Sequence, residues 1–140
     1  MWETINKDRA AAGVKPLALD PLVSKAASIH VADMVANGFI DHTGSDGSTP
    51  QTRMRRLGVV FRFGSENVSM ECARDQATAV RNIRAWMMAE PLAEGLYNHR
   101  WNLMHGGYTR IGIAFGIARN GCWVMAEVFA DGEPSPGSLR

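Results

Sequence analysis

The sequence predicts an α+β fold, a three-layer α/β/α sandwich built around a central antiparallel sheet. Three observations lead to this prediction. Helix start and stop residues delimit two segments in the first half, an amphipathic helix pattern occupies the middle, and two alternating apolar runs form the last third. Neither face of the two apolar runs is polar, so we expect helices to cover the sheet on both sides.

Two helices are predicted near the start of the chain. Residues 2–12 suit a first helix, because the glycine that follows them is a common helix end. Residues 21–37 suit a second helix, since an Asp-Pro pair provides an N-cap and a proline at the first helical position, and a glycine follows the last turn. His30 falls on the apolar stripe of this helix, so we expect a core histidine with its hydrogen bonds satisfied.

The middle of the chain is predicted to contain helices and one strand. A turn-rich loop precedes a Thr-Pro pair, where a short helix begins that the next glycine ends. Residues 59–70 have strand character. Asp75 then caps an amphipathic helix that ends or kinks at Pro91, and residues 97–104 suit one further short helix.

The last third predicts a β-hairpin followed by a tail. Residues 111–118 and 122–129 alternate as strands do, and the Asn-Gly pair at positions 120 and 121 suits a two-residue type I′ turn. Residues 131–140 contain two prolines and two glycines, which favour an extended or loose segment. Since there is no internal repeat or linker, we place a single domain at residues 1–130 and a C-terminal tail at residues 131–140.

Composition and charge narrow the class of protein. A chain of 140 residues with 46% apolar and 21% charged residues is ordinary for one soluble globular domain. The net charge of +1 provides no strong field for nucleic acid or an anionic membrane, so we expect no nucleic-acid partner. The basic cluster Arg53, Arg55 and Arg56 lacks interleaved aromatic residues and is interpreted as a solvated helix face. No large exposed apolar stripe is evident, which favours a monomer.

The start of the chain and its two cysteines bear on the compartment. No apolar run approaches the roughly 20 residues that span a bilayer, and the first residues lead directly into a helical pattern rather than a signal peptide. The chain is therefore either cytosolic or a trimmed form of an exported protein. Cys72 and Cys122 lack the spacing of a metal site and are either bridged or buried as free thiols.

Two histidines and a glutamate carry most of the candidate chemistry. Of four histidines in the chain, His42 lies in an Asp-His-Thr context and His99 in an Asn-His-Arg context, while Glu66 lies in the segment Ser-Glu-Asn-Val. Such a set can ligate a metal, relay a proton or tie three loops together. The side chains alone favour a hydrogen-bonded structural network, with an incomplete Zn²⁺ site on His42 and His99 as the alternative.

Motifs along most of the chain resemble the CAP superfamily, which includes cysteine-rich secretory proteins, antigen 5 and the plant pathogenesis-related proteins. The similarity is to its compact bacterial branch, the SCP-like domains. It depends on the order and spacing of the motifs rather than on any single one. The matching segments are Ile5–Arg9, Gly13–Pro16, Leu19–Leu22, Ala27–Met34, Asn37–Phe39, Asp41–His42, Asp46–Pro50, Ser65–Val68, Asn98–Leu103 and Tyr108–Ile113.

The resemblance implies a cleft with two histidines and two acids. By motif, His42 and His99 match the histidines, and Glu66 matches the first acid. At the place expected for the second acid the chain has Ala89, and Glu90 follows one residue later, a shift of about 100° around a helix. Glu90 is therefore a fourth candidate that departs from the family pattern. Two further departures are a serine where the family signature has glycine and a longer connection after Glu90.

The resemblance also implies a secreted or extracytoplasmic domain, with the export signal outside this sequence. It favours a binding role, for a lipid or sterol or for an extracellular protein or cell-wall ligand, in a cleft that binds divalent Zn²⁺ weakly through His42 and His99. Two alternatives stay open. One is a metal-dependent hydrolase that acts on peptide or cell-wall substrates, with Glu66 as general base. The other is a structural interaction scaffold whose histidines only hold loops together.

Overall fold

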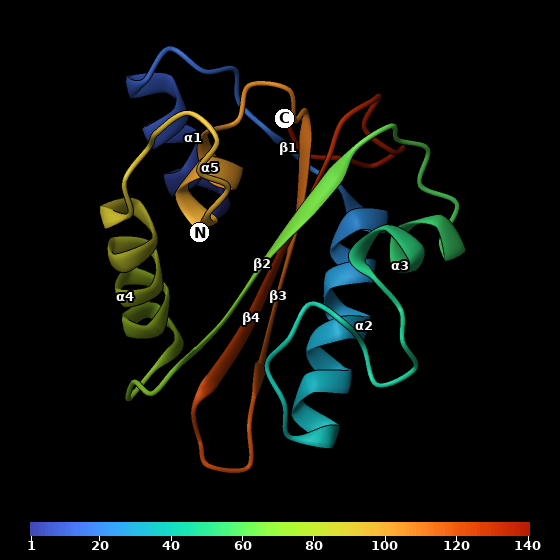
Figure 1. Cartoon of the computed structure of the whole chain (residues 1–140), viewed down its shortest axis with the longest axis vertical. Helices are drawn as coiled ribbons and strands as arrows, with labels where there is room; N and C mark the ends of the chain where they lie inside the picture. Colours follow the sequence, from blue (N-terminus) through green and yellow to red (C-terminus); the bar gives the residue numbers. More distant parts are fainter.

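The computed structural model describes residues 1–140 and confirms the α+β class. A four-stranded sheet, seen nearly edge-on in Figure 1, lies between α1, α4 and α5 on one side and α2 and α3 on the other. None of the helices combines the length and the apolar character that a membrane span requires. The elements are α1 (Trp2–Ala11), β1 (Ala18–Leu19), α2 (Pro21–Asn37), α3 (Pro50–Arg56), β2 (Gly64–Glu71), α4 (Gln76–Ala89), α5 (His99–Met104), β3 (Arg110–Ile117) and β4 (Trp123–Ala130).

The sheet places β2 at one edge. Its strand order is β1-β3-β4-β2, so β4 pairs antiparallel with both β2 and β3. The short β1 pairs with β3 in parallel, so the sheet is antiparallel except at this far edge. In β2, Glu66 lies opposite Val128, and Asn67 lies opposite Glu127. Because successive side chains of a strand point to opposite faces, Glu66 and Asn67 face different helical layers.

One hydrophobic core fills the space between the sheet and α2. The Asp20 side chain accepts hydrogen bonds from the backbone N–H groups of Leu22 and Val23 and caps this helix as predicted. Gly112 in β3 allows the close approach of α2, because an added Cβ would lie only 2.1 Å from the carbonyl carbon of Val23. The small and branched side chains of this core include Val23, Ala26, Ala27, Val31, Met34, Met54, Val124, Ala126, Val128 and Ala130.

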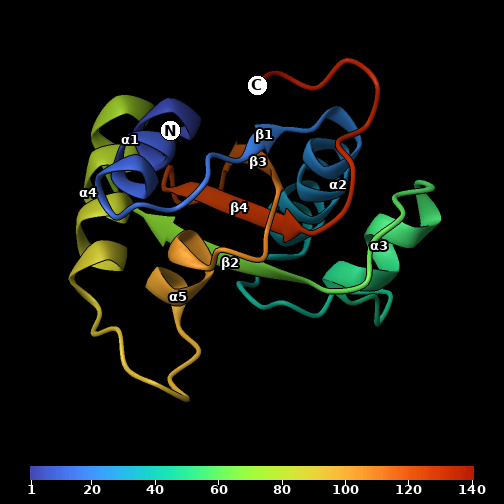
Figure 2. The same ribbon diagram turned by 90° about the horizontal axis from the view of Figure 1, so that it is seen from above.

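A second core lies on the other face of the sheet, between the sheet and α1, α4 and α5 (Figure 2). The buried guanidinium of Arg9 donates hydrogen bonds to the backbone carbonyls of Lys15, Leu103 and His105, and so ties α1 to α5. These carbonyl oxygens replace the water that a buried guanidinium loses. The prediction that helices cover both faces is confirmed. The apolar side chains of this core are Ile5, Leu17, Ile83, Met87, Leu103, Tyr108, Ile111, Met125 and Phe129.

The strand predicted at residues 59–70 begins later than expected. β2 starts at Gly64, and residues 59–63 form a loop. The backbone N–H groups of Arg62 and Phe63 donate to the carboxylate of Asp131, just beyond the end of β4. The branched and aromatic residues of this loop favoured a strand, but β4 ends at Ala130, so no strand lies beside them to complete a ladder.

The turn of the β3–β4 hairpin also differs from the prediction. Three residues, 119–121, lie between Ala118 and Cys122, whose backbones are hydrogen-bonded to each other. Only Gly121 has a positive φ, of 80°, whereas a type I′ turn needs positive φ at both central residues. The predicted two-residue turn is therefore wrong. Asn120 instead accepts a hydrogen bond from the backbone N–H of Cys122 through its side chain, which stabilises the three-residue loop.

A disulfide joins β2 and β4 at one end of the sheet, and the C-terminal tail bonds to β1 at the far edge. Cys72, just after β2, forms a disulfide with Cys122, just before β4, so the bridge extends the strand pairing by one step. The sequence alone had left open whether these two cysteines are bridged or free. At the other end of the molecule, the tail returns to the sheet, because Leu139 and Leu19 exchange backbone hydrogen bonds beside β1. The tail is thus extended but held against the sheet.

We expect reduction of the Cys72–Cys122 disulfide to lower the free energy of unfolding by about 4 kcal/mol. The reason is that the bridge restricts the unfolded chain across a sequence separation of 50 residues. Denaturant unfolding of oxidised and reduced protein measures the difference. In the double variant Cys72→Ser, Cys122→Ser, the reductant should have no effect. Equal stability of the oxidised and reduced forms of the unmodified protein would contradict the prediction.

Candidate functional site

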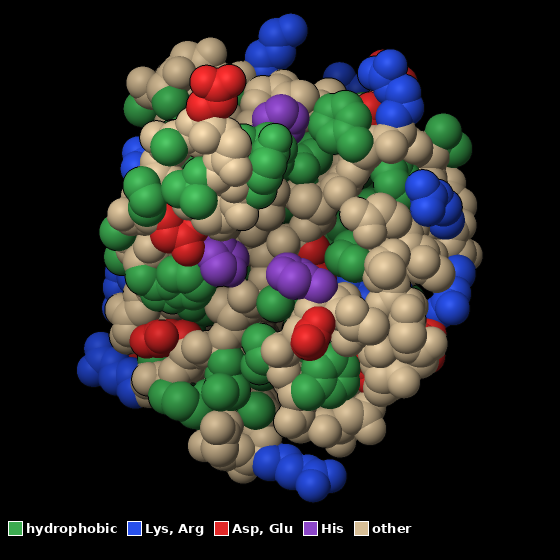
Figure 3. Space-filling view, viewed as in Figure 1, with side chains coloured by type: hydrophobic (Ala, Val, Ile, Leu, Met, Phe, Trp, Pro, Cys, Tyr) green, Lys and Arg blue, Asp and Glu red, His purple; other side chains and the backbone are tan.

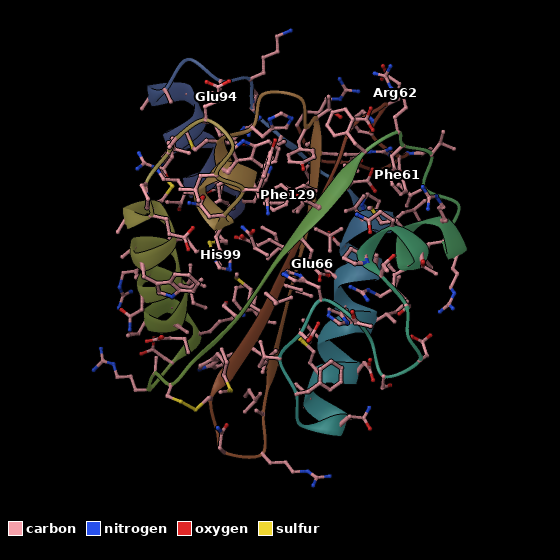
Figure 4. All side chains as sticks on the ribbon, viewed as in Figure 1. Phe61, Arg62, Glu66, Glu94, His99 and Phe129 are labelled. Atoms are coloured by element: carbon pink, nitrogen blue, oxygen red, sulfur yellow. A yellow bond between two sulfur atoms is a disulfide. The ribbon has the colours of Figure 1, made fainter.

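The candidate residues gather on both sides of the edge strand β2. Figure 4 shows Glu66 on β2 and His99 to one side of it, at the start of α5. His42 lies in the loop between α2 and α3. Figure 3 shows two histidine side chains near the middle of this face of the molecule. The side chains of His42 and His99 are 54% and 31% exposed, whereas the side chain of Glu66 is fully buried.

The Glu66 carboxylate is held by two partners. Its Oε1 lies 3.0 Å from Nδ1 of His42, and its Oε2 accepts a 2.7 Å hydrogen bond from Nη2 of Arg53. Because the carboxylate is buried, the charge of Arg53 supplies the compensation that burial requires. With Nδ1 donating to Glu66, the imidazole of His42 is fixed in orientation and its Nε2 is left free.

Arg53 also holds the loop that carries His42. Its guanidinium donates to the backbone carbonyl of His42 at 3.1 Å and to that of Ser48 at 2.9 Å. Arg53 is only 3% exposed, so the prediction of a solvated basic face is wrong for this residue. Arg53 points inward because the buried carboxylate of Glu66 needs a cation beside it. The sequence could not predict this position, since the burial of Glu66 is known only from the structure.

His30 lies behind the same carboxylate. Its Nε2 lies 2.7 Å from the carbonyl oxygen of Asp41 and 3.6 Å from Oε1 of Glu66. The shorter contact is the hydrogen bond, with Nε2–H donating to the carbonyl, because 3.6 Å exceeds hydrogen-bond range. The prediction of a buried histidine is confirmed. Its Nε2 is hydrogen-bonded as expected, whereas Nδ1 has no hydrogen-bond partner within the protein.

On the other side of β2, His99 pairs with Glu90. Nδ1 of His99 lies 2.7 Å from Oε1 of Glu90, and Oε2 of Glu90 accepts a hydrogen bond from the backbone N–H of Arg100. The ring of Trp86 meets the His99 ring edge-on, with 4.9 Å between centroids. Glu90 follows the last turn of α4 and has an extended backbone, with φ −62° and ψ 144°. Because it has left the helix, the expected rotation of about 100° per residue does not carry it away from His99.

Asn67 connects the two halves of the site. Its Nδ2 donates to the backbone carbonyl of His99 at 3.2 Å and to Oε2 of Glu127 at 3.0 Å. Asn102 in turn donates to Oδ1 of Asn67 and, more weakly, to the backbone carbonyl of Glu66. The neighbours Glu66 and Asn67 therefore position one histidine each. Glu127 was not among the predicted site residues. It could have been found from the sequence, because it is the single acid in an otherwise apolar strand.

Three groups in and behind the site have shifted pKa values. The hydrogen bond to Glu66 raises the pKa of His42, against the opposing effect of burial. Burial tends to raise the pKa of Glu90, but the hydrogen bonds from His99 and from the backbone N–H of Arg100 lower it overall. Burial raises the pKa of Glu127 to about 7, and the hydrogen bond from Asn67 offsets this only in part.

His42 and His99 are the groups of this site with nitrogen atoms that could ligate a metal. No group of three or more His, Cys, Asp or Glu side chains is arranged to hold a metal ion. In both His42 and His99, Nδ1 faces a carboxylate, so Nε2 is the nitrogen available to a ligand. The arrangement therefore offers two oriented imidazole nitrogens on either side of β2.

We expect the stability of the fold to fall as pH rises from about 4.5 to about 7, in part because of Glu127. The folded state keeps this carboxyl protonated up to about 7, whereas the unfolded chain ionises at about 4.5, so folding takes up a proton in this window. Glu127→Gln removes that proton uptake. Thermal unfolding from pH 5 to 8 should show the variant gaining stability relative to the unmodified protein as pH rises.

The comparison between the two proteins cancels the contribution of His42, which titrates in both. Glu133→Gln, at an exposed position, is the matched control and should follow the unmodified protein at every pH. Parallel loss of stability in the Glu127→Gln variant and the unmodified protein would show that Glu127 does not titrate in this range.

A sequence model of the CAP, or cysteine-rich secretory protein, family matches residues 2–126. A curated relative, the uncharacterized protein YkwD of Bacillus subtilis, is 29% identical over 113 residues, which are 81% of this chain and 40% of that protein. The chain therefore spans less than half the length of this relative.

Two solved structures share the fold. An extracellular protein containing a SCP domain from Bacillus anthracis matches with a TM-score of 0.71 and 22% identity, over 94% of this chain and 39% of that one. An outer surface protein from Borrelia burgdorferi matches with a TM-score of 0.76 and 19% identity, over 94% of this chain and 90% of that one. At these identities the likeness establishes the fold alone. The match of the family model to residues 2–126 shows more: the chain belongs to the cysteine-rich secretory protein family.

Proposed function

We propose that this domain binds a partner outside the cytoplasm, and that its cleft binds Zn²⁺ through Nε2 of His42 and Nε2 of His99. The observation that carries the metal proposal is the matched environment of the two imidazoles. Each Nδ1 lies against a carboxylate, at 3.0 Å for His42 and Glu66 and at 2.7 Å for His99 and Glu90. Histidines that ligate metals usually donate their other ring N–H in this way, which fixes the tautomer and the ring orientation.

The donor set fits Zn²⁺ as a weak site. Neutral imidazole nitrogen is a good ligand for this ion, at distances of about 2.0–2.1 Å. Two protein ligands leave further positions to water or to an oxygen atom of the partner. Bound there, Zn²⁺ would supply a Lewis acid that attracts a carbonyl or carboxylate of the partner. Since the imidazoles must be deprotonated at Nε2, occupancy depends on metal supply and on pH.

The geometry supports binding more than turnover. A hydrolase that uses Glu66 as general base needs a carboxylate oxygen free to take a proton in the cleft. Both oxygens of Glu66 are engaged, by His42 and Arg53, and the side chain is fully buried. We therefore assign Glu66 and Glu90 to positioning the imidazoles and rank the metal-dependent hydrolase second.

A location outside the cytoplasm is consistent with two further observations. The Cys72–Cys122 disulfide suits an oxidising compartment, since cytosolic thiols are usually kept reduced. The two structural neighbours are described as an extracellular protein and an outer surface protein. In this proposal the partner is an extracellular protein or cell-wall ligand, or a lipid or sterol.

We expect Zn²⁺ to bind the unmodified protein with micromolar affinity at about pH 7.5, and His42→Ala and His99→Ala each to weaken binding about ten-fold or more. Isothermal calorimetry measures the affinity, and circular dichroism checks that both variants stay folded. His105→Ala, a half-buried histidine outside the paired sites, is the matched control and should bind as the unmodified protein does. Absence of binding to the unmodified protein would rule out Zn²⁺ at this site and favour the structural scaffold.

Glu90→Ala should weaken Zn²⁺ binding by about 10- to 100-fold, because His99 loses the carboxylate that orients its ring. The same calorimetric titration tests this. Glu94→Ala is the control, since Glu94 is an exposed residue of the same connection and forms no ion pair. Unchanged affinity in Glu90→Ala would contradict the positioning role of Glu90.

A further inference from the structure

The outward edge of β2 consists of alternate backbone groups. The backbone N–H of Asp131 donates to the carbonyl of Phe63, so these two residues form a hydrogen-bonded pair. In the antiparallel register of β2 with β4, the backbone groups of every second residue after Phe63 therefore also face β4. The backbone N–H and C=O groups of Gly64, Glu66, Val68 and Met70 therefore point away from the sheet. Since β2 is the last strand of the sheet, no strand pairs with them.

Half of this edge is covered by side chains, and half is open. Nε2 of Gln51 donates to the carbonyl of Gly64 at 2.8 Å, and Nδ2 of Asn102 donates to the carbonyl of Glu66 at 3.3 Å. No side chain and no backbone outside the sheet bonds to the outward groups of Val68 or Met70. Proteins usually protect such an edge with a charge, a proline or a covering element, and this stretch has none of these.

An apolar pocket lies beside the open stretch. We call it the Met70 pocket; it has a volume of about 270 Å³. Met70 is 44% exposed and Ile40 is 39% exposed, so both present apolar surface to solvent. Arg119, on the hairpin loop, also lines the pocket and forms no ion pair, so it offers an uncompensated positive charge there. The principal apolar residues that line it are Met34, Val35, Phe39, Ile40, Met70 and Val124.

We propose that an extended peptide segment of a partner protein pairs with Val68–Met70 as an additional strand. Neighbouring side chains across two strands point to the same face, so the peptide residue opposite Met70 faces the side of the sheet on which the Met70 pocket lies. A large apolar side chain at that position enters the pocket, and an acidic side chain two residues away, on the same face of the peptide, meets Arg119. This mode of recognition takes affinity from the backbone and specificity from alternate side chains.

The open edge selects a peptide over other occupants. An acyl chain could fill the Met70 pocket but would leave the backbone groups of Val68 and Met70 without partners. A second copy of the domain would have to bring a sheet edge to β2, but the loops before α3 and before α5 project past β2 on its two sides (Figure 2). A single extended chain is narrow enough to lie between them. The proposal does not depend on a metal at His42 and His99.

The test uses a synthetic peptide with the sequence Thr-Val-Thr-Leu-Thr-Glu-Thr, blocked at both ends, and the complete ¹⁵N-labelled chain. Leu and Glu are two residues apart in this peptide, so both face the Met70 pocket. In an NMR titration up to about 1 mM peptide, the amide signals of Val68 and Met70 should shift together with those of Phe39 and Ile40. The same peptide methylated on alternate backbone nitrogens along one edge should bind about ten-fold more weakly, whereas methylation along the other edge should have little effect.

Protein variants test the same contacts from the other side. Met70→Pro removes one outward N–H while the bonds of β2 to β4 remain, since proline is tolerated where a strand N–H faces solvent. It should weaken peptide binding about ten-fold, whereas the control Met70→Leu should stay within about two-fold of the unmodified protein. Arg119→Glu should weaken binding of this peptide but not of its glutamine analogue.

Several results would overturn the proposal. These are no shift at Val68 and Met70, equal affinity for both methylated peptides, displacement of the peptide by decanoate from the Met70 pocket, or a protein dimer that Met70→Pro dissociates. Zn²⁺ binding is measured in parallel in Met70→Pro, and peptide binding in His42→Ala. Zn²⁺ affinity should be retained in the first and peptide affinity in the second, so failure of one proposal is distinguished from failure of the other.

Discussion

The burial of the Glu66 carboxylate is the constraint on which the rest of the candidate site depends. A carboxylate without solvent is tolerated only where a cation and hydrogen bonds replace the lost water. Arg53 supplies both, and the same guanidinium holds the backbone carbonyls of His42 and Ser48. One buried ion pair therefore fastens α3, β2 and the loop that carries His42 to one another. Loss of either partner would leave the other charge buried and uncompensated, which makes the orientation of His42 part of the stability of the fold.

The edge position of β2 explains how one strand positions residues on both sides of the candidate site. Strand alternation sends Glu66 toward α2 and α3 and sends Asn67 toward α4 and α5. Since β2 has a neighbour on only one side, loops from both helical layers can approach its free edge and bring His42 and His99 to it. The same openness leaves the backbone of Val68 and Met70 unpaired. The candidate metal site and the candidate peptide edge are thus two consequences of one topological feature.

The two histidines reach similar environments by different structural means. His42 depends on Glu66, an acid in β2 whose side chain is fully buried behind the imidazole. His99 depends on Glu90, which lies after the end of a helix, and on the edge of the Trp86 ring. The Glu90 side chain is 23% exposed, so the second pair is closer to solvent than the first. The candidate site therefore has one side fixed by a buried ion pair and one side carried by the connection between α4 and α5, residues 90–98.

The helices, their ends and the family motifs could be recognised from the sequence by itself, because each depends on residues close together in the chain. Asp20 before Pro21 and Gly38 after Asn37 specify α2 without any distant contact. The alternation of β3 and β4 likewise predicted a sheet covered on both faces. By the same local rules residues 59–63 suited a strand and Asn120-Gly121 suited a two-residue turn. Both predictions were wrong, because strand pairing and backbone φ depend on what lies opposite.

Only the tertiary structure decided that Arg53 is buried, that Cys72 bonds to Cys122, and that Glu90 reaches His99. Each of these depends on the desolvation of a group by residues distant in sequence, or on the distance between two such residues, and neither quantity can be read from neighbours along the chain.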